Sequence, residues 1–149
     1  MSIRQISVFL ENKPGRLAEV ARALAAAGVG VYSVSVADTA NFGILRMIVS
    51  DARLAQDTLK ARGLTAKITE VVAMEMSRGP GSLAEILTDL EAMDISIEYM
   101  YAFTSRAKDY DAIVVFRFAG QEEALAKIKR ERPGSIKLLG EEVIRGLEG

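Results

Sequence analysis

The sequence contains no cysteine and no histidine among its 149 residues. The lack of cysteine excludes a disulfide framework, a thiolate nucleophile and a zinc–thiolate site. The lack of histidine removes the commonest general base and the commonest metal ligand. These absences remove the commonest groups for metal binding and catalysis, and the sequence as a whole leads us to predict no metal ion, no other cofactor and no catalytic residues.

The sequence also lacks a charge excess and long apolar runs. Nineteen basic and twenty acidic residues give a net charge of −1, which provides no global attraction for nucleic acid or an anionic membrane. No apolar run reaches the ~18 residues that a membrane span needs. The N-terminal residues, Met1-Ser2-Ile3-Arg4-Gln5, lack the apolar core of a signal peptide. We expect a cytoplasmic protein that binds neither nucleic acid nor membranes.

One phrase occurs twice in the sequence. The stretch 11–19, Glu-Asn-Lys-Pro-Gly-Arg-Leu-Ala-Glu, returns at 77–85 as Ser-Arg-Gly-Pro-Gly-Ser-Leu-Ala-Glu, at an offset of 66 residues. Repeats of this kind indicate copies of one structural unit. We predict two domains, 1–70 and 71–149, the second with a short C-terminal extension. Halves of roughly 70 residues bury only marginal cores, so we expect each half to depend on the other.

Hydrophobic periodicity gives both halves the same order of elements. In the first half it predicts strands over 3–10, 29–37, 44–49 and 66–72, with helices over 16–27 and 52–62. In the second half it predicts strands over 72–76, 95–103, 113–118 and 136–139, helices over 82–93 and 122–130, and a terminal helix over 141–147. The predicted fold class is α+β. It consists of two ferredoxin-like βαββαβ domains, each an antiparallel four-stranded sheet with two helices on one face.

The strand–Pro-Gly–helix junction of each half is the best candidate for a binding site. The first turn of a helix has backbone N–H groups without intrahelical partners, and together with the helix dipole they favour an anion such as a carboxylate. Gly15 and Gly81 would let a ligand approach the backbone closely. On spacing alone, a plain strand-to-helix turn is the alternative.

The repeated phrase, followed by a helix, Ala-Gly-Val and a strand, resembles the ACT domain over both halves. ACT domains are small regulatory domains with the βαββαβ fold that bind amino acids. The resemblance implies a ligand between the Pro-Gly loop of one unit and the second strand of another. It places the following first-loop residues at the ligand: Asn12, Pro14, Gly15, Arg16 and Leu17.

In this comparison the amides of Gly15 to Leu17 hold the ligand carboxylate, and Asn12 orients the carboxylate or the ammonium group. The matching residues of the second loop are Arg78, Pro80, Gly81, Ser82 and Leu83. Because Arg78 replaces the asparagine, we expect the second loop to prefer a different ligand or none.

The second strand of each half supplies weaker candidates. Ser33, Ser35 and Asp38 lie on or just after it in the first half, and Tyr99 and Tyr101 occupy the matching places in the second. Asp38 could pair with a ligand ammonium. The alternatives are a polar strand face for the serines, a turn at Asp38 and sheet packing for the tyrosines.

These observations predict a non-catalytic sensor that binds a free amino acid or a similar small metabolite. We expect a homodimer that acts on an enzyme or another regulator. Two alternatives stay open. One is an interaction module without a ligand, and the other is a small enzyme that uses Asp38, Tyr99 or Tyr101, Lys13 or Arg16 as its reactive group.

Overall fold

The computed structural model describes residues 2–11, 13–38, 41–104 and 112–147. The chain divides into two compact units, composed mainly of Arg4–Thr69 and Glu70–Leu147. We call them the first and the second unit. No helix in these described ranges is long and apolar enough to cross a membrane.

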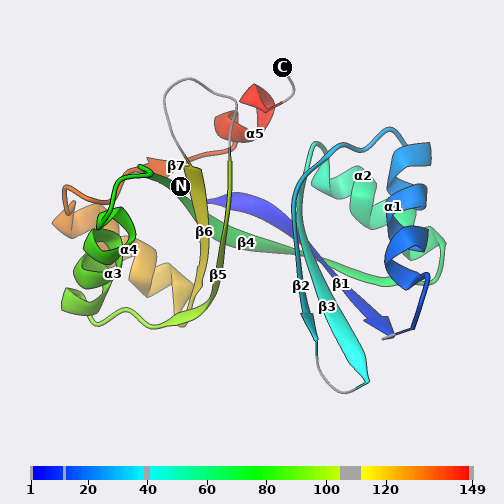
Figure 1. Cartoon of the computed structure of the whole chain (residues 1–149), viewed down its shortest axis with the longest axis horizontal. Coiled ribbons are helices and arrows are strands. Elements are labelled where there is room, and N and C mark those ends of the chain that lie inside the picture. The colour runs from blue at the N-terminus through cyan, green and yellow to red at the C-terminus, as the bar shows by residue number, and fades with distance from the viewer. Residues whose placement is uncertain (1, 12, 39–40, 105–111, 148–149) are drawn as a thin grey trace. The chain divides into compact units, whose positions relative to one another are not determined.

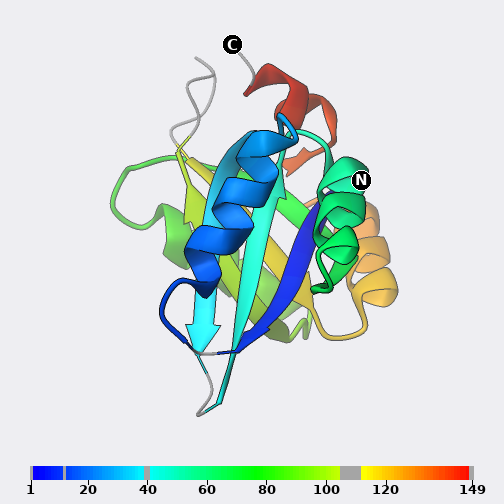
Figure 2. The ribbon, with the colours of Figure 1, turned by 90° about the vertical axis from the view of Figure 1, so that its right-hand side faces the viewer.

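The first unit has two helices packed on one sheet face (Figures 1 and 2). Its strands occur in the spatial order β2-β3-β1-β4, and β3 runs antiparallel to both β1 and β2. The elements are β1 (Ile3–Glu11), α1 (Arg16–Ala26), β2 (Val31–Asp38), β3 (Phe42–Val49), α2 (Ala52–Ala61) and the start of β4 (Thr65–Met76).

Alternation and helical spacing explain why the first unit forms these elements. On β1, the alternate residues Ile6, Val8 and Leu10 point into the core, as the two-residue period of a strand requires. Helix α1 buries Val20, Ala23 and Leu24, which share one face because they are three and four residues apart. The core of the first unit therefore lies between its sheet and its two helices.

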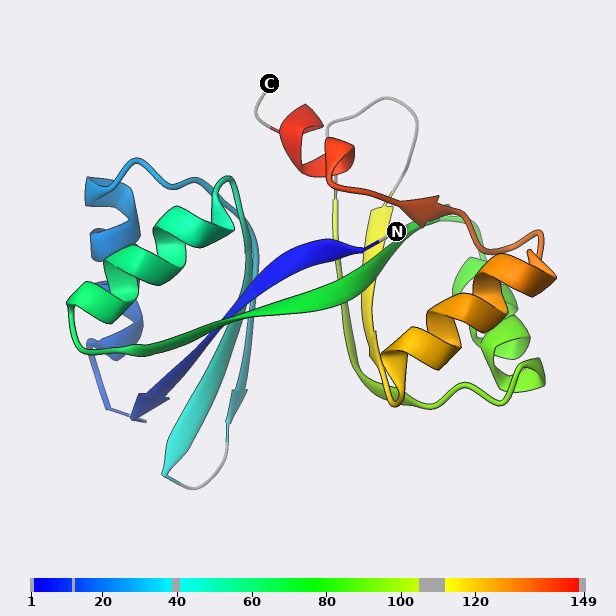
Figure 3. The ribbon, with the colours of Figure 1, turned by 180° about the vertical axis from the view of Figure 1, so that it is seen from behind.

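The second unit repeats this plan with its own core, in which Phe116 stacks on Phe118 with ring centroids 5.3 Å apart. The strand order is β5-β6-β4-β7, and β6 runs antiparallel to β5 and β4. In Figure 3 the orange α4 and the green α3 lie on the same side of their strands. The further elements are α3 (Ser82–Ala92), β5 (Ile97–Phe103), β6 (Ala112–Phe118), α4 (Gln121–Glu131), β7 (Leu138–Leu139) and α5 (Glu142–Gly146).

The structural repeat extends to local irregularities. The register of β2 against β3 shifts between Val31 and Ser33, and that of β5 against β6 shifts between Ile97 and Tyr99, 66 residues later.

The predicted fold class, a pair of ferredoxin-like domains, is confirmed. Two elements differ in detail. The predicted strands 66–72 and 72–76 are one continuous strand, β4, and the last strand is shorter than 136–139.

Candidate ligand-binding site

The two Pro-Gly loops have the same backbone conformation. Gly15 precedes α1 with φ 88° and ψ −11°, and Gly81 precedes α3 with φ 90° and ψ −10°. Glycine adopts this left-handed region without the clash that a Cβ would introduce. The amide of Arg16 donates to the Lys13 carbonyl over 3.3 Å, and Ser82 donates to the Gly79 carbonyl over the same distance. Each loop therefore turns sharply into its helix.

Both helices begin without a side-chain cap. Within the described residues, the amides of Leu17 and Ala18 at the start of α1 donate no hydrogen bond, and the same is true of Leu83 and Ala84 at the start of α3. Such N–H groups and the positive end of the helix dipole favour an anionic partner. The backbone could thus receive a carboxylate at either loop.

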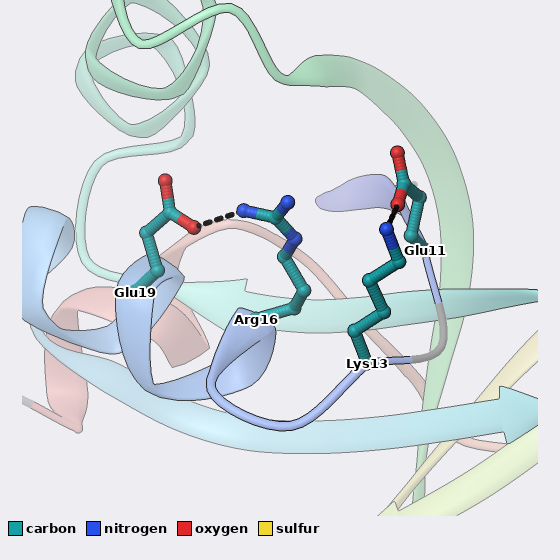
Figure 4. A network of polar contacts seen from close by, with 4 residues as sticks. All are labelled: Glu11, Lys13, Arg16 and Glu19. Atoms are coloured by element: carbon teal, nitrogen blue, oxygen red, sulfur yellow. Dashed lines mark hydrogen bonds and ion pairs between the residues drawn. The ribbon is translucent and has the colours of Figure 1, made fainter.

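Two ion pairs surround the first loop (Figure 4). Lys13 Nζ lies 2.9 Å from Glu11 Oε2, and Arg16 Nη1 lies 2.9 Å from Glu19 Oε2. The loop therefore carries two cations and two anions beside the open helix end. These four groups have no net charge together, but they include a partner for an anionic ligand group and a partner for a cationic one.

The charges of the first loop affect one another. The hydrogen bond from Lys13 and its positive charge hold the pKa of the Glu11 carboxyl below its ordinary value, and Arg16 adds a smaller effect in the same direction. Glu11 therefore stays ionised to a lower pH than an isolated glutamate does.

A hollow of about 180 Å³ opens beside these charges. Its walls come from the end of β1, the loop with the first turn of α1, and the neighbouring parts of β2 and β3. It is lined by Leu10, Glu11, Lys13, Arg16, Leu17, Val36, Gly43 and Leu45. The hollow thus combines charged groups with an apolar surface.

A second hollow of about 370 Å³ also contacts Arg16 and Glu11. Its lining is different, since it includes the exposed rings of Phe9 and Phe42 and the guanidinium of Arg62, which follows α2. Lys67 Nζ lies 5.9 Å from the centre of the Phe9 ring. This side of the loop is therefore richer in aromatic and cationic groups.

The second loop lacks three of the four charged groups that surround the first loop. At an offset of 66 residues, Ser77 and Ser82 take the places of Glu11 and Arg16, and a hydrogen bond joins their two hydroxyl groups. Gly79 stands where the first loop has Lys13. The backbone is the same, but the charges differ: Glu85 matches Glu19, and Arg78 stands where the first loop has Asn12.

The structure brings some of the predicted site residues together. Arg16 and Leu17 line the first hollow, directly after Pro14 and Gly15. Asn12 lies outside the described residues, and its role stays a prediction. In the second loop, the following predicted residues lie between β4 and the start of α3: Arg78, Pro80, Gly81, Ser82 and Leu83.

The predicted residues on the second strands do not line the first hollow. Val36 pairs with Leu45, whose side chain is in the core under the helices. Since side chains alternate along a strand, Ser33 and Ser35 point to the other sheet face. Asp38 pairs with Gly43 through its backbone, and its side chain is outside the described part.

The same alternation applies to β5. Met100 pairs with Phe116 and packs against the core, so Tyr99 and Tyr101 point to the face away from the helices. A binding role for the serines and the tyrosines stays a prediction.

Glu11, Lys13 and Val36 line the hollow but were not among the predicted binding residues. A signal for Val36 was available, because Val34 and Val36 alternate with the serines and one of the two faces had to meet the helices. The described residues hold no group of three or more acidic side chains that could bind a metal ion.

Comparisons with known proteins give the family context. The sequence model of the family described as an ACT domain pair matches residues 1–134. The crystal structure of protein BT0572 from Bacteroides thetaiotaomicron is 38% identical, with a TM-score of 0.84 over 97% of this chain and 96% of that one. No curated protein matches the sequence.

Two more distant structures are regulatory subunits of aspartate kinase. The ligand-free subunit from Thermus thermophilus is 18% identical, with a TM-score of 0.56 over 85% of this chain and 91% of that one. The subunit from Thermus flavus is also 18% identical, with a TM-score of 0.56 over 87% and 92%. At this identity the likeness concerns the fold alone.

Proposed function

This chain belongs to the family of ACT domain pairs, and from that premise we propose that it is a non-catalytic regulator that binds a free amino acid at its first Pro-Gly loop. The observation that carries the proposal is the meeting of three features at this loop. The start of α1 has open amides, charges of both signs surround it, and an apolar hollow adjoins it.

Each part of an amino acid has a counterpart at this site. The ligand carboxylate accepts hydrogen bonds from the amides of Leu17 and Ala18, next to the Arg16 guanidinium. The ligand ammonium pairs with the Glu11 carboxylate, whose pKa Lys13 holds below the ordinary value. The ligand side chain enters the hollow.

The ion pairs at the first loop do not prevent the ligand from binding there. The side chains of Lys13 and Glu11 are 65% and 52% exposed, and pairs that are so accessible to water contribute little to stability. A ligand with a carboxylate and an ammonium group can therefore replace contacts within these ion pairs by its own contacts to the same charged groups at little cost in free energy.

We further propose that the chain forms a homodimer through β2. This strand lies at the edge of the first unit's sheet, and Val34 and Val36 on it are 60% and 49% exposed. An open edge with apolar side chains is prone to pair with another chain. A ligand that favours one arrangement of the two copies would shift the population of the dimer and so signal to an enzyme or another regulator.

Calorimetry of the intact protein with the common amino acids tests the binding proposal. We expect one chemical class to bind, and Arg16→Ala to weaken its binding about tenfold or more, since a hydrogen bond to a charged group contributes roughly 1.5–3 kcal/mol. Arg53→Ala is the matched control. It removes an equally charged side chain from an exposed ion pair on α2, 3.6 Å from Asp57, and should bind like the wild type.

The interaction module is the second candidate function, and the exposed valines of β2 favour it. A protein that binds no amino acid in calorimetry and still dimerises would support this candidate. Equal loss of binding in Arg16→Ala and Arg53→Ala would contradict the placement of the ligand at the first loop.

A further inference from the structure

The hollow beside the first loop is apolar inside and charged at its mouth. Leu10 and Leu45 form its floor and are only 4% and 3% exposed. Leu17 from α1 and Val36 from β2 form the walls, and both are about half exposed. The remaining lining residues are Glu11, Lys13, Arg16 and Gly43.

The size of the hollow limits its occupant. Water takes up about 30 Å³ per molecule in the liquid, and a methyl or methylene group is of similar size. A volume of about 180 Å³ therefore holds about six non-hydrogen atoms. That is enough for a side chain of three or four carbon atoms and part of the backbone, whereas a phenylalanine side chain alone has about seven carbon atoms.

The charges at the mouth limit its chemistry as well. The proposed contacts of the ligand carboxylate and ammonium already use the charged groups Arg16 and Glu11, and Lys13 stays paired with Glu11, whose two carboxylate oxygens can accept from both cations. A charged ligand side chain would then lie against Leu10, Leu45 and Val36, where no polar partner compensates for its lost hydration. An aliphatic side chain instead gains from being removed from water.

We infer that the first loop selects a neutral aliphatic amino acid of the size of valine, leucine or isoleucine. This inference rests on the proposed function and adds the class of ligand to it. The apolar groups of Leu17, Val36 and Leu45 contact the ligand side chain, and Gly43 leaves the space that it occupies.

Gly43 offers a direct way to reduce that space. A Cβ built on it would lie 3.9 Å from Val36 Cγ1 and 3.9 Å from the Ala37 carbonyl oxygen, which is ordinary van der Waals contact. Its φ is outside the left-handed region, so alanine fits the backbone of β3. Gly43→Ala should therefore keep the fold and take up about one methyl group of the hollow.

The experiment compares calorimetric affinities of the wild type, Gly43→Ala and Arg62→Ala for alanine, valine, leucine, phenylalanine, lysine and glutamate. We expect the wild type to prefer valine or leucine to the other four ligands. Gly43→Ala should lose about tenfold in affinity for leucine and less for valine. Arg62→Ala, which changes only the neighbouring hollow, should leave both affinities unchanged.

A second variant keeps the test valid if Gly43→Ala alters the protein. Val36→Thr keeps the branched shape that β2 favours and replaces one methyl group with a hydroxyl. It should weaken binding of leucine several-fold.

The two proposals fail in different ways. Preferred binding of phenylalanine, lysine or glutamate, or unchanged leucine affinity in both Gly43→Ala and Val36→Thr, would overturn the aliphatic class and leave amino-acid binding in place. No binding of any amino acid would overturn the proposed function together with this inference.

Discussion

The end of α3 contains an aspartate in a position that favours glycine, and Asp94→Gly should stabilise the protein. Asp94 has φ 56°, whereas its counterpart in the first unit is Gly28 with φ 76°. The backbone around the two is alike. Gly28 donates to the Ala25 carbonyl over 3.1 Å, and Asp94 donates to the Glu91 carbonyl over 2.9 Å. The substitution therefore changes the side chain within an established helix end.

Two effects of Asp94→Gly raise the free energy of unfolding, and a third lowers it. A non-glycine residue in the left-handed region costs about 1–2 kcal/mol, with aspartate near the lower limit. A negative charge directly after the last turn opposes the helix dipole by about 0.3–1 kcal/mol. Glycine lowers the stability by about 0.5–1 kcal/mol, because it gives the unfolded chain more conformational freedom to lose on folding. The balance is a gain in the free energy of unfolding of about 0.5–1 kcal/mol.

Urea unfolding and thermal melting measure this gain. For a chain of this size the melting temperature should rise by roughly 1–4 °C. Asp94→Asn separates the effect of the charge from the effect of the backbone conformation, because asparagine removes the charge and still tolerates a positive φ. The reverse change, Gly28→Asp, should destabilise by a similar amount. A loss of stability in Asp94→Gly would refute the reasoning.

Three further predictions concern four substitutions. Gly15→Ala and Gly81→Ala should each destabilise by about 1 kcal/mol, because φ is near 90° in both and alanine resists it; unchanged urea midpoints would contradict this. Lys13→Ala should return the pKa of Glu11 toward its ordinary value, which NMR titration of the carboxyl can follow. In the wild type, the stabilisation from ionised Glu11 is present above about pH 4.3 and is lost as the pH falls through the lowered pKa; an identical stability profile in the variant would disprove it. Val34→Asp should convert the proposed dimer to a folded monomer in analytical ultracentrifugation, and an intact dimer would exclude β2 as the interface.

The sequence predicts the fold well because its signals are local and repeated. Hydrophobic periods locate every helix and strand of both units to within a few residues. Gly28 and Gly63 have positive φ just beyond the ends of α1 and α2, as the sequence indicates. Asp94 and Arg132, which also have positive φ, carry no such signal of their own. Only the repeat with Gly28 identifies Asp94.

The candidate site is less predictable, because it depends on which strand face meets the helices. On β2, serines and valines alternate, and both patterns are compatible with a half-buried strand. The pairing of Val36 with Leu45 decides the matter, and pairing between strands is a long-range property. The space beside Gly43 likewise appears only when three strands and a helix come together.

The two loops share a backbone but offer different chemistry to a ligand. The first has Glu11 and Arg16 where the second has Ser77 and Ser82, whose hydroxyl groups bond each other. At the first loop, the proposed zwitterionic ligand would replace the ion pairs within the protein by ion pairs with itself. At the second loop it would have to break the serine contact and would find no ionised group at those positions in return. We therefore expect calorimetry to count one amino acid per chain, and two equal sites per chain would show that the shared backbone, not the charged rim, determines binding.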